Sequence, residues 1–233
     1  MELFLKPIGI IESCFKDRFA IPRQSLIVTE ARAKIIIYKQ FQPELCLEGL
    51  EGFSHLWVLF GFHLNKNNRY HAKVHPPRLG GKSMGLFATR TPHRPNPIGL
   101  SVVQLSQIEK DGIVIRGADV ANGTPVYDIK PYLKEIESIP HAQSGWMGET
   151  PYDELEVRYN NEELEKKVID WEKRIGQTKI SELIIQTLKQ DPRPLVYRNT
   201  EGSYLESHAF RLFDGDIHFQ VNGKLCTIID IKF

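Results

Sequence analysis

Long hydrophobic runs are missing from this 233-residue chain. The longest candidate, Leu56 to Phe62, is far shorter than the roughly 18–20 apolar residues that a membrane-spanning helix needs. The first residues, MELFLKPIGIIES, contain one cation, Lys6, and no small-residue cleavage site follows, so they do not read as a secretory signal peptide. We therefore expect a cytoplasmic protein that is not inserted in a membrane.

Cysteine is also scarce. The three cysteines, Cys14, Cys46 and Cys226, are odd in number and far apart. This pattern predicts neither a disulfide framework nor a zinc knuckle, and we expect buried or incidental thiols. His71 and His75 are four residues apart, but the adjoining prolines disfavour the helix that would align them as ligands, so no metal site is expected.

Two common nucleotide-binding motifs are lacking. The residues 80–83, Gly-Gly-Lys-Ser, resemble the end of a phosphate-binding P-loop, but the motif needs glycine where Pro76 stands. The residues after Ser83 read as a strand, whereas a P-loop needs a helix N-terminus at this point. There is also no Gly-x-Gly-x-x-Gly between a strand and a helix, which argues against a Rossmann-type cofactor domain.

Acidic residues are absent from Gly52 to Ile108, although 25% of the chain is charged. This basic segment holds five of the eight histidines and seven cations, Lys66, Arg69, Lys73, Arg78, Lys82, Arg90 and Arg94. In a chain of net charge +1, such a segment points to a polyanion or an anionic cofactor at one surface. The alternative is a solvated basic face without a partner.

Short strands dominate the first 140 residues. Apolar or β-branched runs at 4–11, 34–38, 55–62, 84–89, 99–105 and 112–116 are bounded by turn-forming residues. Asp111-Gly112 and Asn122-Gly123 predict tight turns, because glycine accepts the positive φ that such turns need. Many short strands with almost no helical period predict a closed or nearly closed antiparallel β-barrel.

The pattern changes near Pro140. Residues 141–151 are rich in Gly, Ser, Gln and Thr and read as a linker. Two helices are predicted next, over 162–174 after Asn160-Asn161 and over 181–190 before Asp191-Pro192, and strands return over 207–231. The predicted fold is mainly β, of the α+β class: a β-barrel domain over 1–140 and a smaller α+β domain over 152–233.

Gly85 to Ser101, GLFATRTPHRPNPIGLS, is the most informative block. Its three prolines stiffen the loop, so a ligand orders its side chains at a smaller loss of entropy. Arg90 and Arg94 can hold a carboxylate or a phosphate through paired N–H donors. A rigid structural crossover with surface arginines is the alternative.

A second block, Ala121 to Leu133, sets an acid, a cation and an aromatic ring on one face of a short strand. Asp128, Lys130 and Tyr132 alternate along the chain, and alternate residues of a strand share a face. Together they can accept an amine proton, bind a phosphate and stack a base, whereas a surface ion pair beside a half-buried tyrosine fits equally well. Farther on, two prolines are expected to hold Arg193 extended and exposed near Tyr197, as a candidate for nucleic-acid contact.

These blocks resemble the TrmO family of S-adenosylmethionine-dependent tRNA methyltransferases. The similarity rests on residues 53–57, 76–81, 85–99, 122–133 and 191–194, which span nearly the whole chain. Arg-Pro-Asn-Pro-Ile-Gly at 94–99 and Asp-Ile-Lys-Pro-Tyr at 128–132 are the specific strings. Asn122 stands where the family often has aspartate, a departure that keeps the turn chemistry.

The resemblance implies a β-barrel enzyme domain outside the Rossmann class, a C-terminal domain, and a homodimer with cofactor sites near the subunit interface. It further implies N6-methylation of N6-threonylcarbamoyladenosine at position 37, in the anticodon loop of a tRNA. By the family pattern, contacts with S-adenosylmethionine fall on Pro22, Arg23, Gln24, Ser25, His63, Leu64, Arg90, Leu100, Gly117, Ala118, Asp119 and Val120. We expect Asp128, Lys130 and Tyr132 to be catalytic, and Arg94, Arg193 and Tyr197 to contact tRNA.

Two other functions stay open at this point. One is a methyltransferase that acts on another RNA or on a small molecule, and the other is a non-catalytic RNA- or nucleotide-binding barrel whose arginines clamp phosphate. Binding of S-adenosylmethionine separates the non-catalytic barrel from both enzymes. The identity of the methylated molecule separates the two enzymes.

Overall fold

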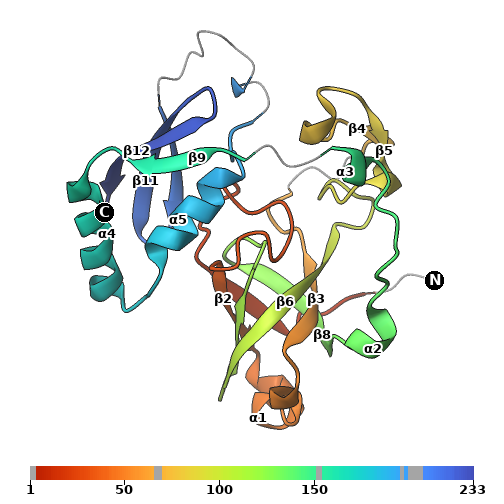
Figure 1. Ribbon diagram of the computed structural model, residues 1–233. Coiled ribbons are helices and arrows are strands. Elements are labelled where there is room, and N and C mark those ends of the chain that lie inside the picture. The colour runs from red at the N-terminus through yellow and green to blue at the C-terminus, as the bar shows by residue number, and fades with distance from the viewer. Residues whose placement is uncertain (1–3, 66–69, 151–153, 195–196, 199–206) are drawn as a thin grey trace.

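The computed structural model describes residues 4–65, 70–150, 154–194, 197–198 and 207–233, so Lys66 and Arg69 of the basic segment lie outside the described residues. Six strands form a closed antiparallel barrel in the order β1-β2-β7-β6-β3-β8 (Figure 1). Their bounds are β1 (Gly9–Ser13), β2 (Arg32–Ile37), β3 (His55–Gly61), β6 (Ile98–Glu109), β7 (Gly112–Arg116) and β8 (Thr124–Pro131). The predicted antiparallel β-barrel is therefore confirmed.

Alternating burial along the strands fills the barrel. On β3, Leu56, Val58 and Phe60 are buried while the residues between them are more exposed, as expected when alternate side chains point inward. The ring of Phe60 lies against Gly99 on β6, where an added Cβ would come within 2.3 Å of it. Glycine at this position therefore lets a large aromatic ring close the end of the barrel.

The connections after β2 and β3 are irregular. The first contains η1 (Lys39–Phe41), α1 (Pro43–Cys46) and η2 (Leu50–Gly52), and the second contains β4 (Lys73–Val74), η3 (Pro77–Leu79), β5 (Met84–Gly85) and η4 (Leu86–Ala88). The strand predicted over 84–89 is wrong beyond Gly85. There the backbone turns, and the Thr89 hydroxyl donates to the carbonyl of Leu86 at 2.8 Å.

As far as the structure describes it, the C-terminal part is a four-stranded sheet with the helices α4 and α5. Its strand order is β10 (His208–Leu212), β11 (Gly215–Asn222), β12 (Leu225–Lys232) and β9 (Glu156–Tyr159), with β9 parallel to β12. The predicted helices are confirmed as α4 (Glu162–Ile175) and α5 (Ile180–Lys189). Asn161 caps α4, since its side chain accepts a 3.0 Å hydrogen bond from the Leu164 amide. Strand β9 was not predicted, because four residues carry too little periodicity.

The segment that joins the two parts packs against the basic segment. It contains α2 (Lys134–Glu137) and α3 (Trp146–Glu149). The Trp146 indole donates to the carbonyl of Ala88 at 2.9 Å, and Arg78 donates to the carbonyl of Met147 at 3.0 Å. The described part of the predicted linker is therefore held beside β4 and β5, as Figure 1 shows for α3.

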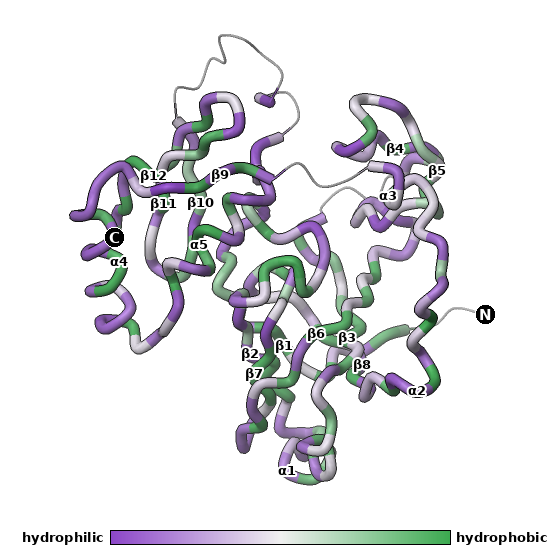
Figure 2. The backbone as a smooth tube through the Cα atoms, in the orientation of Figure 1, coloured by the Kyte–Doolittle hydropathy of each residue, from purple (hydrophilic) through white to green (hydrophobic). Residues whose placement is uncertain are grey.

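Two hydrophobic cores support the molecule, and one of them crosses the predicted domain boundary. The first fills the barrel. The second joins α4, α5 and the C-terminal sheet to residues of the loop between β1 and β2, which are Cys14, Phe15, Ala20, Val28 and Ala31. Apolar stretches of this loop run next to those of the C-terminal part in Figure 2. Among the described residues, no helix combines the length and apolar character that crossing a membrane requires.

Candidate functional site

A cavity of about 580 Å³ opens at the end of the barrel where β1, β3 and β7 stop. Four segments line it: the β1–β2 loop, the end of β3 with the residues after it, the proline-rich loop that leads into β6, and the β7–β8 turn. These segments are far apart in the sequence, and only closure of the barrel brings them together. The volume lies within the range of small-molecule and cofactor sites, roughly 300–1,000 Å³.

Most of the residues expected to contact the cofactor meet at this cavity. Nine of the twelve line it: Pro22, Arg23, Gln24, His63, Leu64, Arg90, Leu100, Asp119 and Val120. Of the other three, Gly117 has a φ of +71° and packs against Leu26, and Ala118 is completely buried. Ser25 follows the wall-forming residues of the β1–β2 loop. Their contact with a cofactor stays a prediction, but their convergence makes one binding site geometrically possible.

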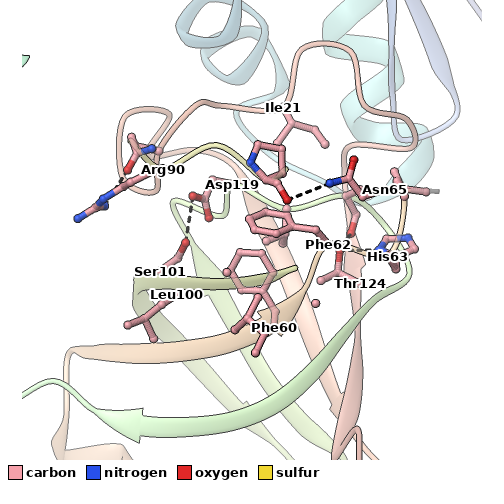
Figure 3. A pocket seen from close by; sticks show the side chains of 18 of the residues that line it. Ile21, Phe60, Phe62, His63, Asn65, Arg90, Leu100, Ser101, Asp119 and Thr124 are labelled. Carbon is pink, nitrogen blue, oxygen red and sulfur yellow. Dashed lines mark hydrogen bonds between the residues drawn. The ribbon is translucent and has the colours of Figure 1, made fainter. Parts of the chain in front are cut away.

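Asp119 is the acidic residue of the cavity wall. Its Oδ2 accepts a 3.0 Å hydrogen bond from the Ser101 hydroxyl (Figure 3), whereas Oδ1 is sealed from solvent and has no hydrogen-bond donor among the described residues. Burial raises the pKa of Asp119 to about 6, against the opposing effects of Ser101, the Ser25 backbone and the charge of Arg90. A buried carboxylate oxygen without a donor is costly when the group is charged, which agrees with the raised pKa of Asp119.

A histidine lies on the side of the cavity opposite Asp119, with Phe60 and Phe62 between them (Figure 3). The His63 ring nitrogen Nδ1 is 3.4 Å from Thr124 Oγ1, and that hydroxyl donates to the carbonyl of Ala121 at 2.7 Å. Burial lowers the pKa of His63, which favours the neutral form of the imidazole. The cavity thus has polar groups at two ends and aromatic rings between them, which suits a ligand with a flat, partly apolar middle.

Both arginines of the proline-rich loop line the cavity. Arg90 donates from Nη1 to Oε1 of Gln24 at 2.7 Å, which ties this loop to the β1–β2 loop. Arg94 donates from Nη1 to the carbonyl of Thr89 at 3.0 Å, and its guanidinium carbon lies 5.7 Å from the centroid of the exposed Phe87 ring. These contacts hold the two cations at the cavity wall.

The predicted catalytic residues lie outside the cavity wall, on the outer face of the barrel. Asp128 and Lys130 do share a face, since Lys130 Nζ is 2.8 Å from Asp128 Oδ2. Val126 points inward, but a β-bulge between Leu59 and Phe60 shifts the register of β8 and turns Asp128 outward. Alternation from Val126 alone would have pointed this carboxylate into the barrel.

This outer face is nevertheless continuous with the cavity. Asp128 pairs with Leu59 on β3, which pairs with Leu100 of the cavity wall on β6. Two strand spacings put Asp128 roughly 10 Å from Leu100. Trp57, another wall residue, has its ring centroid 6.1 Å from that of Tyr132, and its indole nitrogen donates to Glu137 at 2.7 Å.

The exposed conformation expected for Arg193 is wrong. Its side chain is only 10% exposed and forms two hydrogen bonds with the carboxylate of Asp191, at 2.9 and 3.0 Å. Asp191 is buried and directly precedes Pro192, so it gives the Arg193 guanidinium a partner inside the protein. The half-buried Tyr197 ring packs against His208, with centroids 5.8 Å apart.

Several wall residues were not singled out from the sequence. They include Arg18, Ile21, Phe62 and Thr124. Ile21 and Phe62 adjoin predicted contacts, and their apolar character resembles that of core residues. Only the positions of the strand ends reveal that they face a cavity.

Comparison with known proteins relates this geometry to a family. Residues 10–138 match the tRNA-methyltransferase O N-terminal domain, and residues 153–233 match the TrmO C-terminal domain. The chain is 40% identical over 219 residues to the tRNA (adenine(37)-N6)-methyltransferase of Escherichia coli K12, covering 92% of this chain and 91% of that protein. It is also 41% identical over 229 residues to a putative S-adenosylmethionine-dependent methyltransferase, RcsF, of Pseudomonas aeruginosa PAO1, covering 97% of this chain and 96% of that protein.

Relatives in other organisms and a solved structure agree. The human tRNA (adenine(37)-N6)-methyltransferase is 48% identical over 139 residues, which are 59% of this chain and 32% of that protein. The crystal structure of TrmO from Pseudomonas aeruginosa superposes with a TM-score of 0.83 at 34% identity, covering 100% of this chain and 99% of that one. The chain belongs to the tRNA-methyltransferase O family.

Proposed function

We propose that this protein transfers a methyl group from S-adenosylmethionine to N6 of N6-threonylcarbamoyladenosine at position 37 of tRNA. The observation that carries the proposal is the cavity at the end of the barrel, where nine of the twelve predicted cofactor contacts converge. The activity named for the Escherichia coli relative, which aligns with 92% of this chain, supports the adenosine at position 37 as the acceptor. The threonylcarbamoyl group is the finer part of the proposal and rests on family resemblance.

The residues of the cavity fit S-adenosylmethionine. This molecule combines a carboxylate, an amine, a ribose and an adenine around a sulfonium. Arg90 supplies donors for a carboxylate, the wall residue Asp119 supplies a carboxylate as an acceptor for N–H or O–H groups, and Phe60 and Phe62 supply an aromatic wall. The sulfonium supplies an electrophilic methyl group with a neutral leaving thioether.

The chain's main task is then to hold and activate the acceptor nitrogen. Positioning alone removes much of the barrier to a transfer between two bound molecules. The N6 lone pair is delocalised into the ring, and the carbamoyl group withdraws it further while making the N6 proton more acidic. We assign to Asp128, or to a nearby backbone carbonyl, the role of accepting this proton. Lys130 is 2.8 Å from the same carboxylate and is proposed to pair with a tRNA phosphate or the threonyl carboxylate.

Tyr132 and Trp57 form the proposed platform for the base. Bases of single-stranded RNA loops are recognised unstacked, against aromatic rings. Tyr132 follows the ion pair of Asp128 and Lys130 along the chain, and its ring centroid is 6.1 Å from that of the wall residue Trp57. Trp57 itself pairs with Lys130 on β8. A base on this platform would lie next to the ion pair and beside a wall residue of the cavity.

A second copy of the chain is proposed to complete the site. Leu100, a predicted cofactor contact, is 54% exposed, and Phe87 beside Arg94 is 82% exposed. Large exposed apolar side chains next to a binding site are typical of an interface. A homodimer whose interface runs along this rim would cover both residues and shield the cavity from water.

The basic segment is the proposed tRNA surface. Its described cations include Lys73, Lys82 and Arg94, and no acid interrupts it between Gly52 and Ile108. Phosphate contacts supply most of the sequence-independent affinity for nucleic acids. Tyr197 remains a predicted contact with an unstacked base, and we place the protein in the cytoplasm, where such a substrate is available.

Two measurements test the proposed function. Isothermal titration calorimetry of the purified protein should detect binding of S-adenosylmethionine, and mass spectrometry of tRNA from cells lacking the protein should show loss of the methyl group on threonylcarbamoyladenosine. Binding without any change in tRNA modification would indicate another acceptor. Failure to bind S-adenosylmethionine or its demethylated product would refute the enzyme function.

A further inference from the structure

One wall of the cavity is supported by the C-terminal domain, residues 153–233. Ile21 lines the cavity on one side and packs on the other against the hydrophobic core that contains Trp171, Ile184 and Leu212. Ala20, the preceding residue, is buried in the same core. The first predicted cofactor loop therefore rests on C-terminal side chains, as well as on the barrel.

The backbone of this wall needs support from its surroundings. Ala20 and Leu26, which bracket the wall, have φ values of 68° and 65°. This left-handed region is unfavourable for residues with a Cβ, so such a conformation persists only where neighbouring structure holds it. On the barrel side, the Leu26 amide donates to the carbonyl of Gly117 at 2.9 Å.

On the C-terminal side, Asp191 provides the corresponding contact. Nη2 of Arg23, a cavity-lining residue, donates to the backbone carbonyl of Asp191 at 3.3 Å. Arg198 donates to the same carbonyl. Asp191 follows α5, so this carbonyl links the end of a C-terminal helix to the cavity wall.

Asp191 is itself held in place by an unusual set of contacts. Its carboxylate is 9% exposed and is 3.3 Å from Nε of Arg198. It accepts two hydrogen bonds from the Arg193 guanidinium and a third from the Arg193 backbone amide. Its φ of 44° is also left-handed. The two arginines therefore fix both the side chain and the carbonyl direction of one residue, and that carbonyl contacts Arg23.

We infer that the C-terminal domain positions the cofactor-side wall of the cavity, and that Asp191 is the positioning residue, acting through Arg23. The inference rests on the cofactor pocket proposed above. Arg193, in this account, fixes Asp191 instead of contacting tRNA. Because coupling between two sites is reciprocal, cofactor binding at Arg23 must also stabilise the chain around Asp191.

Asp191→Asn tests the inference, since asparagine tolerates the left-handed conformation but carries no charge for Arg193 and Arg198 to hold. The matched control is Asp230→Asn on β12, which removes a carboxylate that pairs with Lys167 of α4 and with Lys232. Asp191→Asn should raise the Kd and KM for S-adenosylmethionine about tenfold with a smaller change in kcat, and the control should leave both at the wild-type value. A purely structural role would instead lower the active fraction, and hence kcat, at unchanged Kd.

A double-mutant cycle with Arg23→Met identifies the route. If Asp191 acts through Arg23, adding Asp191→Asn to Arg23→Met should change the Kd by less than twofold, because the interaction is already lost. Unchanged Kd in folded Asp191→Asn, or fully additive effects in the double variant, would overturn the inference.

Amide hydrogen exchange keeps the inference testable if a variant fails to fold or if wild-type protein does not bind the cofactor. In the wild type, S-adenosylmethionine should slow amide exchange at residues 188–193. If it slows exchange at residues 21–26 but not at 188–193, the coupling between the cavity wall and Asp191 is refuted. Without any ligand, residues 21–26 should exchange faster in Asp191→Asn than in Asp230→Asn. Equal rates in that comparison also refute it, whereas absence of wild-type binding counts against the proposed function alone.

Discussion

Arg90 and Gln24, which are 66 residues apart in the chain, are joined by a 2.7 Å hydrogen bond from the guanidinium to the side-chain carbonyl. Both residues line the cavity, so this bond joins two predicted cofactor loops into one wall. A planar guanidinium can donate to Gln24 and keep further N–H donors for a carboxylate.

Replacing Arg90 with alanine should therefore weaken cofactor binding. A hydrogen bond to a charged group contributes about 1.5–3 kcal/mol, so we expect the Kd for S-adenosylmethionine to rise roughly 10- to 100-fold. Gln24→Ala, the control, removes the bond between the loops but leaves the cation, and should raise the Kd less. Calorimetry that finds the two variants equal would mean that Arg90 acts only by fixing the loop.

Asp119→Asn should make the fold more stable at neutral pH. The raised pKa means that the folded protein binds this proton more tightly than the unfolded chain, so wild-type stability falls as the pH rises from 3.8 to about 6. Asp119→Asn has no titrating group here and does not lose this stability. Above pH 6 its free energy of unfolding should exceed that of the wild type by up to about 3 kcal/mol. Thermal unfolding of both proteins across the window measures the difference.

Ser101→Ala provides the control for that experiment. The Ser101 hydroxyl donates to Asp119 and favours its charged form, so removing the hydroxyl should raise the pKa of Asp119 further and extend the loss of stability to higher pH. A constant difference between wild type and Asp119→Asn at every pH would show that Asp119 does not titrate in the window.

Asp128→Asn should bind the cofactor as the wild type does but methylate tRNA slowly. Asp128 lies on the outer face, roughly 10 Å from Leu100, so its loss leaves the cavity intact. General-base catalysis typically contributes 10²–10⁴-fold, and we expect kcat to fall within about that range. Single-turnover methyl transfer measures the rate, and wild-type turnover by the variant would remove Asp128 from the mechanism.

Affinity for tRNA should fall steeply with added salt. Each phosphate neutralised by a cation contributes roughly 0.7–0.9 to the slope of log K against log salt. Lys73→Ala and Lys82→Ala should each make this slope shallower by about the contribution of one phosphate contact. Lys173→Ala, on the exposed face of α4, should leave the slope unchanged. Filter binding over a salt series measures the slope. An affinity for tRNA that did not change with salt would contradict the proposed surface.

The sequence allowed most of the barrel to be predicted because its strands carry strong local patterns. Strand β3 and the β6–β7 hairpin were located from an apolar run and from Asp111-Gly112. Strand β9 could not be located, since its four residues become a strand only by pairing with β12, far along the chain. Phe15 and Trp171 belong to one hydrophobic core although they are far apart in the sequence. No local sequence pattern predicts that they meet.

The candidate site was predicted in part. Family resemblance identified residues that the barrel does bring together, such as His63 and Asp119. The side on which Asp128 lies depends on a single extra residue in β8, which alternation cannot reveal. The burial of Arg193 likewise depends on the conformation of Asp191, whose left-handed φ is set by tertiary contacts.

The most direct test incubates the purified protein with S-adenosylmethionine and tRNA that carries threonylcarbamoyladenosine at position 37, followed by nucleoside mass spectrometry. We expect this nucleoside to gain one methyl group at N6 and the same tRNA with an unmodified adenosine to gain little. No methylation, or methylation of a different nucleoside, would contradict the proposed function.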